Sequence, residues 1–209
     1  MKRSITSLLA LASVIVAPVH PRIVLAEDAA RTKPDIFGVA SGIVAVVCPL
    51  TVGGAFQAKT SALSGQLVLG VGEPGALTGQ LVVDLKTLQT GIGLRDNHLR
   101  EKYLEVQRGP AYTAAVLDRI RVEGIDFTQP EGKARFRGVL TLHGEQREVS
   151  GTADIRRSGA GLRVRATFAT RISDFQIPSP TYLGVGVQDE VTIKVSFHAL
   201  SAQDIQAAR

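Results

Sequence analysis

Apolar and polar residues alternate along most of this chain with a period of two, which is the pattern of β-strands that bury one face. In the last such run, apolar side chains alternate with Thr192, Lys194, Ser196 and His198. About eight runs of this kind lie between residues 41 and 200, separated by turns. Short, evenly spaced strands without a second-domain boundary predict one all-β domain, an antiparallel sandwich or a closed barrel.

One segment departs from this alternation. Leu99 and Tyr103 recur at helical spacing after Asp96, which we expect to be the N-cap, and Gly109 and Pro110 should end the helix. An amphipathic helix among strands suits a plug or flap over one side of a barrel. We therefore expect one short helix, packed near the mouth.

The first 26 residues have the features of an export signal. Lys2 and Arg3 precede an uncharged apolar run over residues 5–19, and small or modest side chains mark a cleavage site after Ala26. A membrane anchor is the alternative, but a bilayer span needs roughly 20 apolar residues and Pro18 interrupts this run too early. We predict a protein without a membrane span that is periplasmic or secreted after cleavage near Ala26.

The rest of the chain divides simply. We expect a flexible leader over residues 27–40, the β-domain over residues 41–200 and a C-terminal tail over residues 201–209. Another uncharged stretch over residues 37–57 contains several glycines and Pro49, which indicate buried strand and turn rather than a spanning helix.

Charge and composition exclude several classes of protein. The net charge is +5, but three of the 24 basic residues lie in the predicted signal, which leaves 21 against 19 acidic residues. This balance and the absence of tryptophan argue against nucleic-acid binding. A single cysteine, Cys48, excludes a disulfide framework and a cysteine-based zinc site, and we expect it to be a small buried apolar residue.

Several positions expected to face inward carry small residues, and this has two interpretations. An eight-stranded barrel either fills its centre with side chains or leaves room for one ligand, and small residues leave volume unfilled. Alternatively, glycines relieve crowding where a sheet bends. The positions are Gly65, Gly79, Ala134, Gly138, Ala153 and Ala166.

A series of short motifs occurs in a fixed order over about residues 41 to 199. They are Gly65, Asp84-Leu85-x-x-Leu88, Thr90-Gly91, Arg95-Asp96-x-His98-Leu99, Pro110, Leu140-Thr141-Leu142-His143-Gly144, Ser173-Asp174-Phe175-x-Ile177 and Asp189-x-Val191. In these motifs the chain resembles the YceI-like family of exported bacterial barrels, which are similar to lipocalins and hold lipids. The resemblance implies an antiparallel eight-stranded lipocalin-like barrel. Departures from the family pattern at Cys48, Tyr103-Leu104 and residues 111–113 concern the ligand preference rather than the fold.

The candidate ligand-binding residues follow from this barrel. We expect them to be Arg95, His98, Leu99, Tyr103, Phe136, Leu140, Phe168, Phe175 and Tyr182. Arg95 and His98, with Arg100 and Lys102, could form a basic collar that holds a phosphate or carboxylate head group. The alternative for Arg95 is a structural pairing with Asp96.

Four side chains, two of them among these candidates, have a structural interpretation. We expect His143 to lie at a turn or on the surface, and Asp174 to cap backbone groups in an irregular loop. Phe175 either packs in the core or lines the pocket. Tyr182 could gate the entrance or simply pack against the loop.

These observations favour a lipid-binding protein over an enzyme. The sequence has no catalytic motif, no paired-histidine metal spacing and no cofactor motif. We expect an exported protein that transports or stores an amphipathic lipid, an isoprenoid or fatty-acyl compound, in the cell envelope. The alternatives are an envelope protein-interaction module with a filled barrel, or an enzyme that acts on an envelope lipid. Monomer and homodimer both remain open.

Overall fold

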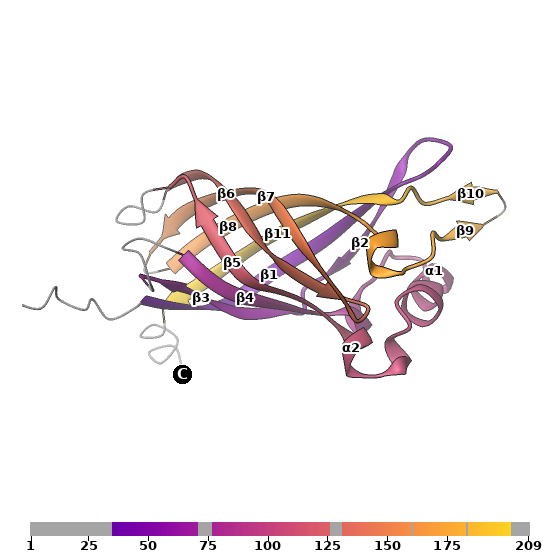
Figure 1. The fold of residues 1–209 in the computed structure, drawn as a ribbon, viewed down its shortest axis with the longest axis horizontal. Coiled ribbons are helices and arrows are strands. Elements are labelled where there is room, and N and C mark those ends of the chain that lie inside the picture. Colours follow the sequence, from indigo (N-terminus) through magenta and orange to yellow (C-terminus); the bar gives the residue numbers. More distant parts are fainter. Residues whose placement is uncertain (1–34, 71–76, 126–130, 160, 183, 202–209) are drawn as a thin grey trace, which may run out of the picture. The chain divides into compact units, whose positions relative to one another are not determined.

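The structure is a computed structural model that describes residues 35–70, 77–125, 131–159, 161–182 and 184–201 (Figure 1). The strands are β1 (Asp35–Pro49), β2 (Ala55–Thr60), β3 (Leu63–Leu69), β4 (Leu77–Asp84), β5 (Ala114–Glu123), β6 (Gly132–Leu142), β7 (Glu145–Ser158), β8 (Gly161–Arg171), β9 (Thr181–Tyr182), β10 (Val185–Gly186) and β11 (Glu190–Ser201). The helical segments are η1 (Leu85–Thr87), α1 (Gly93–Asn97), η2 (His98–Tyr103), η3 (Val106–Arg108), α2 (Pro110–Thr113) and η4 (Ser173–Phe175).

Eight antiparallel strands close into a barrel in the order β1-β3-β4-β5-β6-β7-β8-β11. The closure is the pairing of β11 with β1, which runs from Phe37 opposite Ser201 to Val47 opposite Thr192. β3 pairs with the first residues of β1 and β2 pairs with its second half, so the two short strands share one place in the wall. Closure through β11 and β1 confirms the predicted eight-stranded barrel.

The barrel begins earlier than the sequence indicated. β1 starts at Asp35, so residues 35–40, assigned above to a flexible leader, are barrel strand, and Phe37 is buried in the core. The predicted export signal, the earlier part of the leader and the tail beyond Ser201 lie outside the described residues.

The alternation predicts the inward faces correctly except where a bulge intervenes. In β5, Ala115 and Leu117 face the interior, and so does Ile120, three residues further on. The register shifts between Asp118 and Arg121, and Arg119 adopts a left-handed backbone conformation with φ 49°. Counted back from Ile120, a strict period of two would place Leu117 on the outer face. The bulge adds one residue to the strand and so shifts the alternation by one position.

The small inward residues do not create a cavity. None of the six contributes to the wall of the hollow described below. A side chain at Gly79 would press against the carbonyl oxygen of Gln66 and lie 3.0 Å from the Cα of Leu67. A side chain at Gly65 would meet the backbone of Gln80 in the same way. Of the two interpretations offered by the sequence, the glycines of β3 and β4 therefore support the second, close approach of strands.

Replacing Gly79 with alanine should destabilise the barrel. The added methyl group has no space against Gln66 and Leu67, and we expect a loss of about 2 kcal/mol in the free energy of unfolding, as for overpacked sites generally. Urea unfolding followed by far-UV circular dichroism measures it. The control is Gly93→Ala, where the methyl group would meet nothing within 4 Å. Equal effects of the two substitutions would contradict this explanation.

The interior is filled at one end of the barrel. At this end β1 begins and β11 ends, and buried side chains from all eight barrel strands pack together: Phe37, Leu67, Leu77, Ile120, Phe136, Ile155, Leu162 and Phe197. The ring of Phe136 contacts that of Phe168 edge to face, with centroids 5.8 Å apart. None of these eight side chains lines the cavity described in the next subsection, whereas Phe168 does line it.

Candidate functional site: an apolar cavity under a helical cap

Two connecting segments cover the other end of the barrel (Figure 1). The first joins β4 to β5 and contains η1, α1, η2, η3 and α2; the second joins β8 to β11 and contains η4 and the β9–β10 hairpin. α1 and η2 follow each other directly, so the predicted short helix is present, although its second half is a π-helix. Pro110 begins α2 rather than ending a helix.

Asp96 does not act as the N-cap that the sequence predicted. It lies inside α1, 8% exposed, and the helix begins after Ile92. Its carboxylate accepts hydrogen bonds of 2.6 Å from the backbone N–H and from the hydroxyl of Thr90. Burial raises the pKa of Asp96, but the bonds from Thr90 and the nearby Arg100 outweigh burial and hold this pKa below its usual range. Asp96 therefore anchors α1 to the preceding loop.

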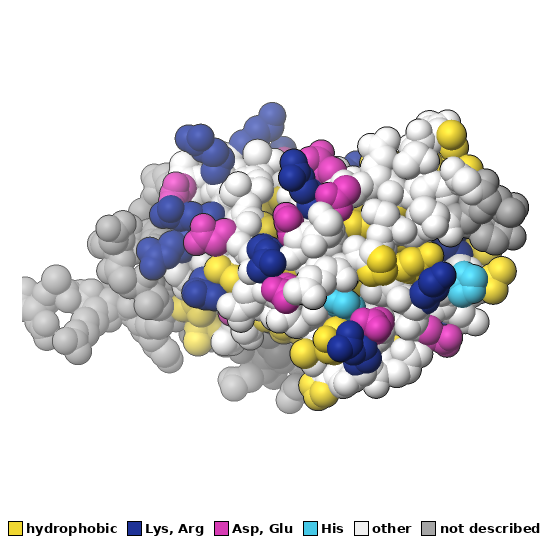
Figure 2. All heavy atoms as spheres, turned by 45° about the vertical axis from the view of Figure 1, so that its right-hand side comes forward, with side chains coloured by type: hydrophobic (Ala, Val, Ile, Leu, Met, Phe, Trp, Pro, Cys, Tyr) yellow, Lys and Arg dark blue, Asp and Glu magenta, His cyan; other side chains and the backbone are white. Residues whose placement is uncertain are grey.

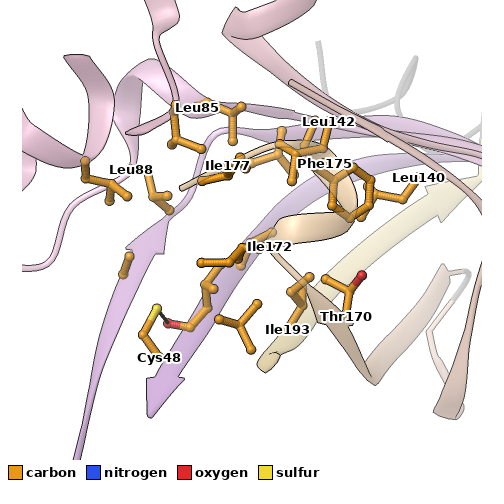
Figure 3. Close-up of a pocket in the computed structure, with 18 of the residues that line it drawn as sticks. Cys48, Leu85, Leu88, Leu140, Leu142, Thr170, Ile172, Phe175, Ile177 and Ile193 are labelled. Carbon is orange, nitrogen blue, oxygen red and sulfur yellow. Dashed lines mark hydrogen bonds between the residues drawn. The ribbon is translucent and has the colours of Figure 1, made fainter. Parts of the chain in front are cut away.

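A cavity lies between this cap and the filled half of the barrel (Figure 3). Its volume is about 160 Å³, and it is partly open to solvent. The wall includes Val44, Val46, Cys48, Phe56, Leu81, Val83, Ala115, Leu117, Leu140, Phe168, Thr170, Ile193 and Val195 from strands, with Leu85, Leu88, Leu99, Tyr103, Ile172, Phe175, Ile177 and Val187 from the cap segments. No lining side chain is charged, so water inside would find few hydrogen-bonding partners.

The structure brings together five of the nine predicted ligand-binding residues. Leu99, Tyr103, Leu140, Phe168 and Phe175 line the cavity, and Phe175 is fully buried, so it both packs in the core and faces the hollow.

The other four predicted residues lie elsewhere. Phe136 is buried beneath Phe168 and does not reach the cavity, because the filled half of the barrel begins there. His98 is exposed on the cap, and Arg95 does not line the cavity either. Tyr182 belongs to β9, but its side chain lies outside the described part of the chain.

Several lining residues were missed by sequence analysis. Phe56 and Cys48 pair with each other across β2 and β1, and the alternation Val44, Val46, Cys48 was a usable signal for the inward face. Burial raises the pKa of the Cys48 thiol to about 11, so the thiol stays protonated as a small apolar group. Ile177 and Val187 come from an irregular loop, where no periodic pattern marks the inward side.

The predicted basic collar is only partly present. Arg100 donates to the carbonyl oxygen of Leu88 at 3.2 Å and to Asn97 at 3.1 Å, which makes it a structural residue of the cap. The ammonium group of Lys102 lies 5.5 Å from the ring centre of Tyr103. Arg95 is half-buried, and its guanidinium group lies 4.5 Å from the ring centre of Phe56, a lining residue.

Arg95 is the collar residue best placed to meet a ligand. The predicted pairing with Asp96 is not observed, since no ion pair joins these two side chains in the described structure and Asp96 bonds to Thr90 instead. A guanidinium group stacked on an aromatic ring keeps its donors available for an anion.

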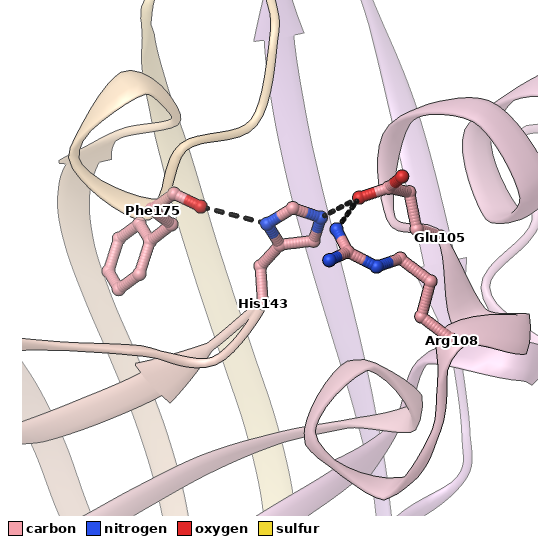
Figure 4. Close-up of polar contacts among 4 residues, drawn as sticks. All are labelled: Glu105, Arg108, His143 and Phe175. Atoms are coloured by element: carbon pink, nitrogen blue, oxygen red, sulfur yellow. Dashed lines mark hydrogen bonds and ion pairs between the residues drawn. The ribbon is translucent and has the colours of Figure 1, made fainter.

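A buried histidine joins the two cap segments (Figure 4). Nδ1 of His143 lies 3.0 Å from the carbonyl oxygen of Phe175, and Nε2 lies 3.0 Å from a carboxylate oxygen of Glu105, which also accepts a bond of 2.7 Å from Arg108. Both partners of the imidazole are oxygen atoms, one of a backbone carbonyl and the other of a carboxylate. We call Glu105, Arg108, His143 and the Phe175 carbonyl the latch. His143 is at a turn as predicted, but it is buried rather than on the surface.

The backbone at the latch is strained. Glu105, His143 and Gln176 have φ of 47°, 54° and 57°, and they are three of the four residues other than glycine with positive φ in the described part of the chain. His143 and Gly144 form the two-residue turn between β6 and β7, where asparagine would adopt positive φ more easily than histidine. Such strain persists where surrounding contacts hold it, and here the imidazole provides those contacts.

The loop capping predicted for Asp174 is performed by Asp189. The carboxylate of Asp189 accepts bonds from the backbone N–H of Ser173 at 2.9 Å and from its hydroxyl at 2.7 Å. These bonds lower the pKa of Asp189. They hold η4 in place, and with it the side chain of Phe175 in the cavity wall.

Acid should weaken the latch. The hydrogen bond from Arg108, assisted by that from His143, holds the pKa of Glu105 below its usual range. The ionised form therefore adds stability above the ordinary carboxyl pKa, and this contribution is lost as the pH falls through the lowered value. We expect the parent to lose more stability between pH 7 and pH 3 than Glu105→Gln, measured by urea midpoints. Equal losses would show that Glu105 is not linked to folding.

A closed antiparallel eight-stranded barrel with an apolar hollow beneath a helical cap defines a lipocalin-like class of protein. Within that class the chain belongs to the YceI-like family, because the family's YceI-like domain matches residues 37–199. No curated protein matches the chain.

Two solved structures are similar to this fold. Burkholderia cenocepacia BcnA aligns with a TM-score of 0.60 at 18% identity, over 75% of this chain and 95% of that chain. A polyisoprenoid binding domain from Saccharophagus degradans, implicated in plant cell wall breakdown, aligns with a TM-score of 0.57 at 16% identity, over 79% of this chain and 98% of that chain. At these identities the likeness establishes a shared fold.

None of the helices in the described residues is long and apolar enough to cross a bilayer. The described part of the chain contains no group of three or more His, Cys, Asp or Glu side chains that could hold a metal ion.

Proposed function

We propose that this chain is an exported lipid-binding protein that holds an amphipathic isoprenoid or fatty-acyl ligand for transport or storage in the cell envelope. The observation that carries the proposal is the cavity itself, which is hollow, partly open and lined without a charged side chain. Membership of the YceI-like family and the fold shared with a domain described as polyisoprenoid binding support it. The signal-like residues 1–26 support export to the periplasm or beyond.

The energetics favour a hydrocarbon guest. Each methylene group that leaves water for such a cavity gains about 0.8 kcal/mol, less the cost of ordering the chain. The partly open side allows a polar head group to remain hydrated while the tail is buried. The cavity wall contains no carboxylate, imidazole or amine for acid–base chemistry, which favours binding over catalysis. A hollow half of the barrel likewise counts against the alternative of a filled interaction module.

Native purification followed by mass spectrometry tests this proposal. We expect an organic extract of the purified protein to contain a lipid with an isoprenoid or fatty-acyl tail. A fluorescent apolar probe should bind the delipidated protein and be displaced by that lipid. Natively purified protein with no lipid, and no displaceable probe binding after delipidation, would overturn the proposal.

Arg95 should select among head groups. If its guanidinium group meets the head of the ligand, Arg95→Ala should weaken binding of palmitate about tenfold and leave binding of hexadecanol nearly unchanged. Competition against the apolar probe measures both. Lys102→Ala, which removes a neighbouring exposed charge, is the control and should change neither affinity much. Equal losses for the two ligands in Arg95→Ala would show that Arg95 acts only through its packing on Phe56.

A further inference from the structure

The cap end of the barrel carries an uncharged rim. The rim comprises residues 49–58, 88–94, 176–182 and 184–188, which are the turn between β1 and β2 with its flanks, the approach to α1, and the described parts of the loop with β9 and β10. None of these residues is charged, although 21% of the chain is. Surface turns are normally polar and charged, so the absence of charged residues from the rim requires an explanation.

Hydrogen bonds join the rim segments to one another and to the strand beside them. Thr51 donates its backbone N–H to the carbonyl oxygen of Gly186 at 2.9 Å, and Gln188 donates to that of Pro49 at 2.8 Å. Gln89 exchanges two backbone bonds with Lys59 at the end of β2, of 2.7 Å and 2.9 Å. Backbone groups that are already paired can enter an apolar medium at low cost, which unpaired groups cannot.

Large apolar side chains project from the rim into solvent. Val52 at the tip of the β1–β2 hairpin is 72% exposed, and Ile92 and Leu94 before and within α1 are 51% and 63% exposed. Neighbouring Gly53, with φ 89°, has open space around it. In the space-filling view the hairpin at the upper right is drawn white and yellow, without blue or magenta (Figure 2). Phe56, Leu88 and Val187 belong to both the rim and the cavity wall, so the two surfaces are continuous.

Basic side chains lie just behind these apolar ones. Arg95 follows Leu94 directly, and Lys59 and Lys102 are exposed on the adjoining β2 and η2. Of the acidic side chains beside the rim, Asp96 is buried and bonded to Thr90, and Asp189 is half-buried and bonded to Ser173. Three others are exposed: Glu101, Asp174 and Glu190. Apolar tips backed by cations match a bilayer interface, where tips enter the acyl region and cations meet anionic head groups.

We propose that the rim docks this protein onto the surface of an anionic phospholipid bilayer, with the cavity facing the membrane. This inference rests on the proposed function, since a carrier of a buried lipid must exchange it with a membrane. A second copy of the chain fits the rim less well. A twofold dimer would bring Arg95 and Lys102 of both copies together, whereas a surface of phosphate groups neutralises them.

Vesicle flotation of the full chain tests the proposal. We expect the protein to float with vesicles of phosphatidylethanolamine and phosphatidylglycerol, and less with vesicles of phosphatidylcholine alone. The double variant Val52→Asp/Leu94→Asp should lose at least about tenfold in partitioning, because two carboxylates replace the apolar tips. The control is Ile43→Asp, a residue of β1 that is 55% exposed but lies outside the rim. It should float like the parent.

Binding of an apolar probe in the absence of vesicles separates this proposal from the proposed function. Val52 and Leu94 do not line the cavity, so the double variant should bind the probe as the parent does. A parent that binds the probe but floats with neither vesicle would overturn docking and leave lipid binding standing. A parent that floats but binds no probe would support docking and overturn lipid binding. A dimer in analytical ultracentrifugation that the double variant dissociates, without vesicle binding, would show that the rim is a self-association surface.

Discussion

The variant Ala115→Phe will bind apolar ligands about a hundredfold more weakly than the parent while remaining folded. Ala115 lines the cavity from β5, and a phenyl ring in its place projects into the space that a ligand would occupy. Displacing about four methylene groups of a lipid tail costs about 3 kcal/mol of binding free energy, and every 1.4 kcal/mol is a tenfold change in Kd. Titration with a fluorescent apolar probe measures the effect.

The neighbouring Val116 provides the matched control. It follows Ala115 in the same strand, does not line the cavity, and successive side chains of a strand point to opposite faces. Val116→Phe therefore adds a ring of the same kind outside the barrel and should leave probe binding unchanged. If both variants bind the probe as well as the parent does, the ligand does not occupy this cavity.

The variant His143→Asn will lose about 3 kcal/mol of stability and exchange bound ligand faster. The shorter side chain cannot reach both Glu105 and the carbonyl oxygen of Phe175, so the two cap segments lose their link. Hydrogen bonds to charged groups contribute about 1.5–3 kcal/mol each, part of which solvent recovers at Glu105. Urea unfolding measures the stability, and stopped-flow release of the probe measures exchange.

Two further variants serve as comparisons: His143→Ala tests the backbone of the turn, and His98→Asn tests a histidine outside the latch. Asparagine tolerates positive φ, so His143→Asn removes the imidazole without adding backbone strain, whereas His143→Ala should cost about 1 kcal/mol more. His98→Asn replaces an exposed histidine of the cap that lies outside the latch, and should change stability by less than about 0.5 kcal/mol. If His143→Asn were as stable as the parent, the latch would not hold the cap.

The sequence predicted the barrel better than the cavity because the two depend on different kinds of information. The inward faces of β6, β7, β8 and β11 follow the alternation, since a strand buries every second side chain whatever its partners are. Leu117 was missed because the bulge at Arg119 shifts the phase within one strand. The early start of β1 was missed because residues 35–40 lie beside a polar leader, and only pairing with β3 and β11 orders them.

Contacts in the cap segments were harder still to predict, because they join residues that are far apart in the sequence. His143 bonds to Glu105, 38 residues away, and to Phe175, 32 residues away. No local pattern relates such positions, so its placement at a turn suggested exposure although the cap buries it. Asp96 and Asp174 were misassigned for the same reason, because a loop carboxylate can cap several neighbouring backbone groups: Asp96 bonds to Thr90, and Asp189 caps the loop in place of Asp174.

The order of apolar and polar residues by itself determined that this chain forms antiparallel strands with one apolar face each, because that face must leave water wherever it packs. Only the tertiary structure decided that the interior is solid at one end and hollow at the other. At the filled end, aromatic and aliphatic side chains from all eight barrel strands meet, and glycines let β3 and β4 approach closely. At the cap end, side chains from the strands and cap segments leave a space between them, and the latch joins the two segments above it.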